Sequence, residues 1–238
     1  MNSQGQSPYA SEAYAYTSSA TRPTLKSSSK ISYNQMMNKT EALVRLTQEI
    51  VADESLPLTE SNLVFGEGDS DTAVMFIGEA PGLREDELKR PFVGRSGQLL
   101  DKLIIEIGWK RADVYITNIV KRRPPDNRDP LPEEIESYKP YLARQIEIIK
   151  PKIIATLGRF SMNYFLPQAK ITRDEGKLFQ AGNYFIYPLF HPAAALRSTG
   201  TLEALRQSFK RLPEAIIKAE GLARTESTPP PPKQSSLF

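Results

Sequence analysis

The chain has 238 residues, of which 31 are Lys or Arg, 28 are Asp or Glu and 39% are hydrophobic, a composition typical of one globular domain with some solvated sequence. It contains no cysteine and one histidine, which excludes disulfides, thiolate nucleophiles and the usual zinc sites. The net charge of +3 is too small to require an anionic partner, so the location of the charges matters more than their sum.

Both ends of the chain have the composition of tails. Residues 1–30 are rich in Ser, Ala, Tyr and Thr without a periodic apolar face, so we expect a disordered tail; an organellar transit peptide is the alternative, because acidic residues are scarce there. Residues 222–238 are polar and Pro-rich, and we expect them to be extended. Residues 31–221 would form the folded domain. No apolar run approaches the ~20 residues that span a bilayer, and the start lacks a secretory signal, so we expect a cytoplasmic protein.

The central part alternates between helical and strand patterns. In chain order, the spacing of apolar residues predicts a helix over 35–52, a strand over 73–78, a helix over 96–107, a strand over 114–120, a helix over 132–149, a strand over 152–157, a short helix over 160–165, a strand over 184–189 and a helix over 202–220. Continuous apolar strands separated by helices are typical of a three-layer α/β/α domain with a mainly parallel sheet, here of about four strands.

Four segments reach the carboxyl edge of this sheet, where such folds place their ligand sites. They are Gly78–Gly82, Thr117–Asn118, Gly158 and Phe190–His191. The first is a turn of small residues and Pro, which lets the backbone approach a ligand closely, although such turns are also common for structural reasons alone. Because no Lys follows Gly97, a P-loop for nucleotide hydrolysis is disfavoured.

Several motifs occur together between Val64 and Arg197. In order they are GEAPG, RPFVGRSGQLLD, VYITNIVKRRPPDNRDPLPEE, PYLARQI, IKPKIIATLG and HPAAALR, and together they resemble the family 4 uracil-DNA glycosylases. The resemblance implies a DNA repair enzyme that flips uracil out of DNA and hydrolyses its N-glycosidic bond, leaving an abasic site. Two alternatives remain open: a non-catalytic module that binds uracil or damaged DNA and recruits the sliding clamp, and a glycosylase of broader range that acts on deaminated purines.

The chain departs from this family at the cofactor. Members typically hold a four-iron, four-sulfur cluster through four cysteines, and the corresponding positions here are Asp53, Leu56, Arg122 and Tyr138. Because such a cluster needs thiolate ligands, we expect no iron–sulfur cluster, no metal and no other cofactor.

The resemblance also assigns a pocket. Phe92 would stack on uracil, with a core aromatic as the alternative. Asn118 would distinguish uracil from cytosine, because an amide both donates and accepts; the alternative is an Asn that caps a turn at the strand end. His191 would donate a hydrogen bond to uracil O2, where negative charge grows as the base departs. Gly78 and Ala80 would complete the substrate-binding wall.

Two carboxylates are catalytic candidates, because a carboxylate can stabilise an oxocarbenium-like sugar and orient water. The resemblance places Glu79 near the reacting sugar. It places Glu85 in the wall against the thymine methyl, paired with Asn127. Which of the two carboxylates orients water stays open.

Basic residues on two loops would bind DNA. One loop follows the second predicted strand and would contact phosphates. The other follows the last strand, where small and apolar residues would enter the space left by the flipped base. The expected DNA-binding residues are Lys121, Arg122, Arg123, Ala194, Leu196 and Arg197.

The segment Gln234–Phe238 resembles the bacterial sliding-clamp-binding pentapeptide, with Gln234 first and Leu237 and Phe238 last. It follows a PPPP spacer that would keep it extended. We therefore expect two partners, uracil-containing DNA and the clamp, with no membrane association. The protein itself is expected to be a monomer.

Overall fold

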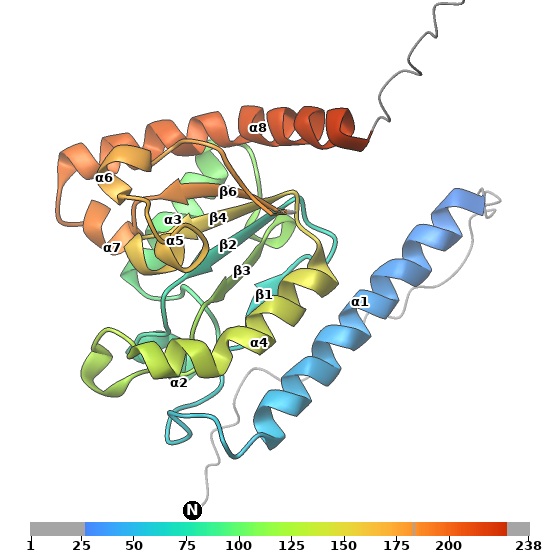
Figure 1. Cartoon of the computed structure of the whole chain (residues 1–238). Coiled ribbons are helices and arrows are strands. Elements are labelled where there is room, and N and C mark those ends of the chain that lie inside the picture. Colours follow the sequence, from blue (N-terminus) through green and yellow to red (C-terminus); the bar gives the residue numbers. More distant parts are fainter. Residues whose placement is uncertain (1–26, 183, 228–238) are drawn as a thin grey trace, which may run out of the picture.

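The computed structural model describes residues 27–182 and 184–227 (Figure 1). Its longer helices are α1 (Ser27–Ala52), α3 (Arg95–Glu106), α4 (Pro132–Ile149) and α8 (Thr199–Ser227). Shorter helical segments are α2 (Leu83–Leu88), η1 (Arg111–Asp113), η2 (Pro125–Asn127), α5 (Arg159–Phe165), α6 (Ile171–Asp174) and α7 (Pro192–Ala195). The strands are β1 (Glu67–Gly68), β2 (Val74–Gly78), β3 (Tyr115–Asn118), β4 (Ile153–Leu157), β5 (Phe179–Ala181) and β6 (Tyr184–Leu189).

The strands form one sheet in the order β1-β3-β2-β4-β6-β5. The four inner strands are parallel neighbours, and they coincide with the four strands predicted from sequence. The edge strands β1 and β5 pair antiparallel with β3 and β6. They raise the number of strands from four to six, because two or three residues are too few to give an apolar pattern.

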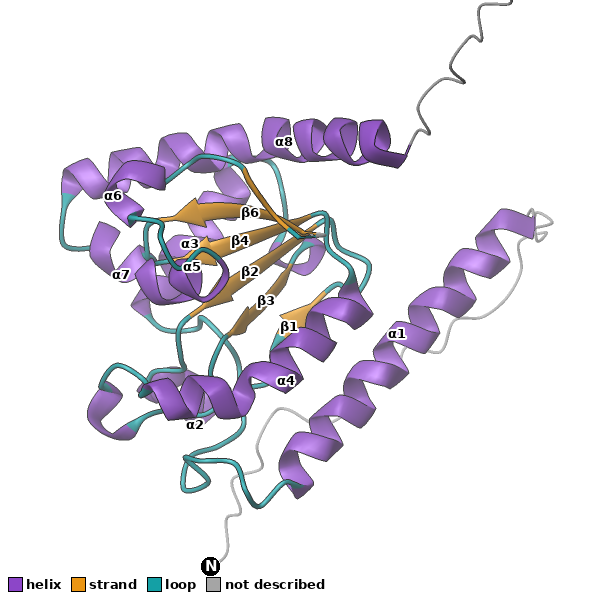
Figure 2. Ribbon diagram, viewed as in Figure 1, coloured by secondary structure: helices purple, strands orange, loops and turns teal. Residues whose placement is uncertain are grey.

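Helices cover both faces of this sheet (Figure 2). Along β2, the side chains of Val74 and Phe76 join a buried cluster with α3, α7 and α8. Those of Met75 and Ile77 join a second cluster with α1 and α4 on the other face, since successive strand residues point to opposite sides. This arrangement confirms the predicted α/β/α layers.

The two end helices extend beyond the predicted domain limits. Helix α1 begins at Ser27 and α8 ends at Ser227, so both helices run a few residues past the expected domain limits at residues 30 and 222. The added turns carry no periodic apolar face, and hydrophobic periodicity therefore gave no signal there, whereas a helix propagates readily once it is nucleated. The remaining tail residues, including the proposed clamp motif, lie outside the described residues. None of the helices in the described part is both long and apolar enough to cross a membrane.

Candidate active site

A cavity of about 640 Å³ opens at the carboxyl edge of the sheet, beyond the ends of β2, β3 and β6. It is therefore located where a parallel sheet places its ligand. Most of the residues singled out in the sequence border this one cavity. These are Glu79, Ala80, Glu85, Phe92, Asn118, Asn127, His191, Ala194 and Arg197.

The floor of the cavity brings an aromatic ring and an amide together over Gly78. A Cβ atom at Gly78 would lie 2.4 Å from Asn118 Oδ1 and 2.5 Å from Phe92 Cζ, so only glycine leaves room for both side chains. The ring of Phe92 also faces His191, with ring centroids 5.8 Å apart and planes inclined by 35°. Three side chains from three distant segments thus meet at one point.

Asn118 has an unused hydrogen-bonding atom. The residue is 1% exposed, and its Oδ1 atom has no hydrogen-bond partner among the described residues. An unsatisfied buried acceptor costs about 1–3 kcal/mol. Since Asn118 borders the cavity, the missing donor can be supplied by a ligand.

His191 is held as a neutral donor. Its Nδ1 accepts a hydrogen bond from the backbone N–H of Ala193 at 3.1 Å, so in the neutral ring Nε2 carries the proton. Burial lowers the pKa of the imidazole to about 4, against an upward influence of Glu85. Gly158, with a φ of +93°, leaves space beside the ring, because a Cβ there would lie 3.0 Å from His191 Cβ.

Glu79 is a half-buried carboxyl group where the chain leaves β2. Burial raises the pKa of Glu79 to about 7, with a further upward contribution from Asp129 and an opposing one from Arg159. The carboxyl group is therefore divided between its two protonation states near neutral pH. Groups tuned in this way are concentrated at functional sites.

Glu85 is bonded differently from the expectation. Its Oε1 accepts backbone N–H bonds from Val93 at 2.9 Å and Gly94 at 2.7 Å, while the Oδ1 of Asn127 accepts from Arg123 Nε at 2.7 Å. The structure therefore shows two separate hydrogen-bonding groups instead of a Glu85–Asn127 pair. The carboxylate of Glu85 is already satisfied by two donors of the loop beside it.

Lys121 does not face DNA, which corrects the sequence-based expectation. Its side chain is 0% exposed, and its Nζ donates to Thr117 Oγ1 at 2.7 Å, to the Asn118 carbonyl at 2.8 Å and to Gln145 Oε1 at 2.6 Å. Burial lowers the pKa of this ammonium well below its ordinary value. A run of basic residues in sequence is typical of a solvated surface, but the first of them turns inward to fasten the end of β3.

The other expected DNA contacts differ in exposure. Arg122 is half-buried, and its Nη1 donates to the Ser61 carbonyl, so its guanidinium is engaged within the fold. Leu196 is 43% exposed, and Ala194 and Arg197 are exposed at the mouth of the cavity. Ala194 and Arg197 of the loop after β6 thus border the cavity. The loop after β3 contributes Arg128 to the lining, whereas Arg123 does not line the cavity and donates to Asn127, which does border it.

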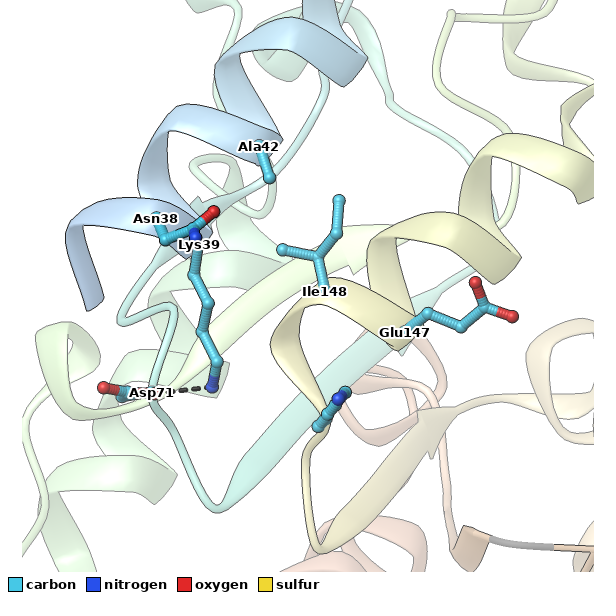
Figure 3. A pocket seen from close by; sticks show the side chains of 7 residues that line it. Asn38, Lys39, Ala42, Asp71, Glu147 and Ile148 are labelled. Atoms are coloured by element: carbon cyan, nitrogen blue, oxygen red, sulfur yellow. Dashed lines mark hydrogen bonds and ion pairs between the residues drawn. The ribbon is translucent and has the colours of Figure 1, made fainter. Parts of the chain in front are cut away.

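A second hollow lies far from these residues, between α1 and the end of α4 (Figure 3). Lys39 crosses it and donates to Asp71 Oδ1 at 2.5 Å, to the Ser70 carbonyl at 3.3 Å and to the Ile149 carbonyl at 3.0 Å. These bonds fasten α1 both to the end of α4 and to the segment between β1 and β2. The hollow borders none of the residues predicted as a site.

No sequence motif pointed to Arg111 as a residue that supports the cavity. Its guanidinium bonds the carbonyls of Pro91 and Phe92, which are 20 and 19 residues away along the chain. It lies outside the motif that contains Phe92. Only the folded arrangement reveals the contact, because no local pattern connects residues so far apart.

Comparison with known proteins decides the family. The model of the uracil DNA glycosylase superfamily matches residues 65–214. The chain belongs to the uracil-DNA glycosylase superfamily. Within it, the chain is similar to type-4 uracil-DNA glycosylases. One from Sulfurisphaera tokodaii is 42% identical over 74% of this chain and 86% of the relative. One from Saccharolobus solfataricus is 47% identical over 65% of this chain and 76% of the relative. One from Thermotoga maritima is 46% identical over 70% of this chain and 88% of the relative.

The iron–sulfur cluster of type-4 glycosylases does not fit this chain. The four corresponding positions lack thiolates, and three of the four side chains already have hydrogen-bond partners. Tyr138 is fully buried and its hydroxyl donates to the Pro57 carbonyl at 2.7 Å, while Leu56 is 5% exposed. The carboxylate of Asp53 accepts a hydrogen bond from the Tyr141 hydroxyl.

Arg122 completes this group. It bonds the Ser61 carbonyl, and it interacts with Tyr138, whose pKa is raised to about 12 by burial against the opposing influence of Arg122. We call Asp53, Leu56, Arg122, Tyr138 and Tyr141 the junction. The junction connects the end of α1, the loop after β3 and helix α4 through side-chain contacts.

Proposed function

We propose that this protein removes uracil from DNA by hydrolysing the N-glycosidic bond and leaving an abasic site. The observation that carries the proposal is the single cavity in which Phe92, Asn118 and His191 meet. The chain belongs to the uracil-DNA glycosylase superfamily and is similar to type-4 enzymes, and both findings support the same activity. A uracil paired in a duplex must first leave the stack, which costs a few kcal/mol.

In the cavity, the ring of Phe92 would stack on the extruded base and the amide of Asn118 would read its edge. Uracil presents N3–H as a donor and O4 as an acceptor. The unpartnered Oδ1 of Asn118 can accept from N3–H, and the amide nitrogen can donate to O4. Cytosine reverses both groups, so it would leave the buried amide unsatisfied.

His191 would stabilise the departing base. Its Nε2–H would donate to uracil O2, where negative charge develops as the bond to the sugar breaks. The neutral ring, fixed by the hydrogen bond from Ala193, is a donor that needs no proton from solvent.

Glu79 would stabilise the positive charge that develops on the sugar and orient the attacking water. It borders the cavity, and its carboxylate form is the one that favours a cation. The contacts of Glu85 with the Val93 and Gly94 backbone support a different task for that residue, which is to position the loop that carries Phe92.

The cavity mouth would bind the DNA strand. Arg197 and Arg123 would contact phosphates, and Ala194 with Leu196 would enter the gap left by the extruded base. The phosphate contacts would make the affinity fall with increasing salt.

The experiment that tests this function is release of uracil from a uracil-containing oligonucleotide, followed by alkaline cleavage of the abasic strand. We expect cleavage with the wild-type protein, and strong loss with Asn118→Ala and His191→Ala. Binding without cleavage by the wild type would instead support a non-catalytic module. Cleavage of oligonucleotides that contain hypoxanthine or xanthine would extend the set of excised bases to deaminated purines.

The C-terminal motif Gln234–Phe238 would bind the bacterial sliding clamp as an extended peptide. The protein would act as a cytoplasmic monomer on the nucleoid. Deleting this segment should abolish clamp binding and spare activity on short oligonucleotides, which a binding assay and the cleavage assay measure separately. Unchanged affinity for the clamp after the deletion would contradict this role.

A further inference from the structure

The loop that carries Phe92 has an unfavourable backbone. Phe92 has a φ of +50°, in the left-handed region that residues with a Cβ atom rarely adopt. A residue remains in that conformation only where its surroundings hold it there. The groups that bind this loop therefore determine where the ring of Phe92 lies.

Arg111 binds the carbonyl side of the loop. From η1, its Nη2 donates to the Pro91 carbonyl at 2.5 Å and its Nη1 to the Phe92 carbonyl at 3.2 Å. These two acceptors belong to the peptide bonds on either side of the Phe92 Cα atom. A planar guanidinium with donors on both nitrogens can bond both carbonyls at once.

Two carboxylates orient this guanidinium. Arg111 Nη1 lies 2.7 Å from Asp101 Oδ1 on α3, and Nη2 lies 2.8 Å from Glu67 Oε1 on β1. The Arg111 side chain is 21% exposed and that of Glu67 27%, so these contacts are partly shielded from solvent. Arg90 also binds Glu67, with its Nε 2.7 Å from Oε2, but it is more exposed.

The opposite side of the loop is bound by other groups. Glu85 accepts the N–H groups of Val93 and Gly94. Helix α3 packs directly on the loop at Gly97, where a Cβ would lie 1.9 Å from the Phe92 carbonyl oxygen. Glu85 borders the cavity, whereas Arg111 is not among the residues that line it.

We propose that Arg111 is a positioning residue for base recognition, which acts on uracil through the Phe92 backbone without touching the base. The inference rests on the proposed function, because the ligand of the Phe92 ring is the extruded uracil. Loss of Arg111 frees two carbonyls and lets the strained loop relax, so the ring leaves the orientation in which it stacks on the base. The phosphate-binding residues at the mouth keep their places.

The experiment compares two ligands in Arg111→Met and Arg111→Lys. The first is free uracil, measured by ligand-observed NMR, and the second is an oligonucleotide with a tetrahydrofuran analogue of the abasic site, which has no base to stack. Arg90→Met is the matched control, since Arg90 binds the same carboxylate of Glu67 without bonding a carbonyl of the loop.

We expect Arg111→Met to weaken binding of free uracil about tenfold, because a charge-assisted pair of hydrogen bonds is lost. Arg111→Lys should fall between wild type and Arg111→Met, since an ammonium lacks the planar geometry. Affinity for the abasic oligonucleotide should stay within about twofold of wild type for all variants, and Arg90→Met should leave both affinities unchanged.

Two results would overturn the inference. One is unchanged uracil binding in Arg111→Met. The other is an equal loss for both ligands together with a lowered melting temperature, which would mean that Arg111 only stabilises the fold. A wild-type protein that excises no uracil would instead refute the proposed function, and that assay is independent of the comparison between variants.

Discussion

The active-site cavity and the junction both draw residues from the loop after β3, together with more distant segments, yet they follow different rules. Phe92, Asn118 and His191 border one cavity, and in the proposed function each would match an atom or face of the extruded base. At the junction, four positions where type-4 relatives are expected to bind a cluster carry a carboxylate, an aliphatic chain, a guanidinium and a phenol. Binding a substrate restricts which side chains can stand at each position, because each must match a particular group. Holding two segments together can be done by side chains of several different types.

The largest effect is expected at the cavity, from His191→Ala. Removing a donor aimed at developing charge should lower kcat about 10²- to 10³-fold, with the melting temperature nearly unchanged. Single-turnover kinetics on a uracil oligonucleotide measures this. A loss below about tenfold would place the main stabilisation of the leaving base elsewhere.

Asn118→Ala should separate recognition from stability. We expect the single-turnover rate to fall about 10- to 100-fold, because one face of uracil loses its partner. The free energy of unfolding should not decrease, since the variant also removes a buried acceptor that has no partner among the described residues. Urea unfolding of the wild type and of Asn118→Ala measures this free energy of unfolding. A clear loss of stability would show that Asn118 supports the fold and favour the turn-capping alternative.

The pH dependence of kcat should follow the ionisation of Glu79. With a pKa raised to about 7, kcat should increase about tenfold per pH unit below that value and level off above it, and Glu79→Gln should lose this ascending limb. Burial favours the neutral form of the Glu79 carboxyl group. The contribution of Glu79 to folding stability is therefore fully present below its ordinary pKa of 4.5 and is lost as the pH rises through about 7.

Glu79→Gln should therefore gain stability relative to wild type as the pH increases from 5 to 8. His191 has the opposite sign, because its pKa is lowered to about 4 and its neutral form is retained across that range. A rate profile without an inflection near pH 7 would contradict the role of Glu79.

The smallest effect is expected at the junction. Tyr138→Phe removes the hydrogen bond to the Pro57 carbonyl and should lower the free energy of unfolding by about 1 kcal/mol, with kcat within about twofold of wild type. Tyr141→Phe, which loses the contact with Asp53 at a less buried position, is the control. A large loss of activity in Tyr138→Phe would mean that junction and cavity are coupled through the loop between them.

The sequence was sufficient where apolar patterns or strand ends decide the outcome. The four inner strands and the helix from Pro132 to Ile149 follow from hydrophobic spacing. The edge rule for parallel sheets brings Asn118 and His191 together, whereas the place of Phe92 beside them was expected only from the family resemblance. The edge strands β1 and β5 were missed because they are too short to show a period.

Side-chain direction was harder to predict. Lys121 was expected on the surface with its basic neighbours, but its position after a buried strand and four residues beyond Thr117 lets it bond Thr117 and Gln145. The bonds of Arg111 and Glu85 to backbone groups have no sequence signature at all, since any residue supplies a carbonyl or an N–H.

The left-handed backbone at Phe92 sets two contributions to stability against each other. The torsion angle alone would favour glycine or asparagine at this position. The ring, however, is 6% exposed and belongs to the buried cluster with α3, α7 and α8. Removing it would cost about 3–5 kcal/mol through lost burial, more than the roughly 1–2 kcal/mol that a relaxed backbone returns, so burial of the ring keeps the strained turn in place.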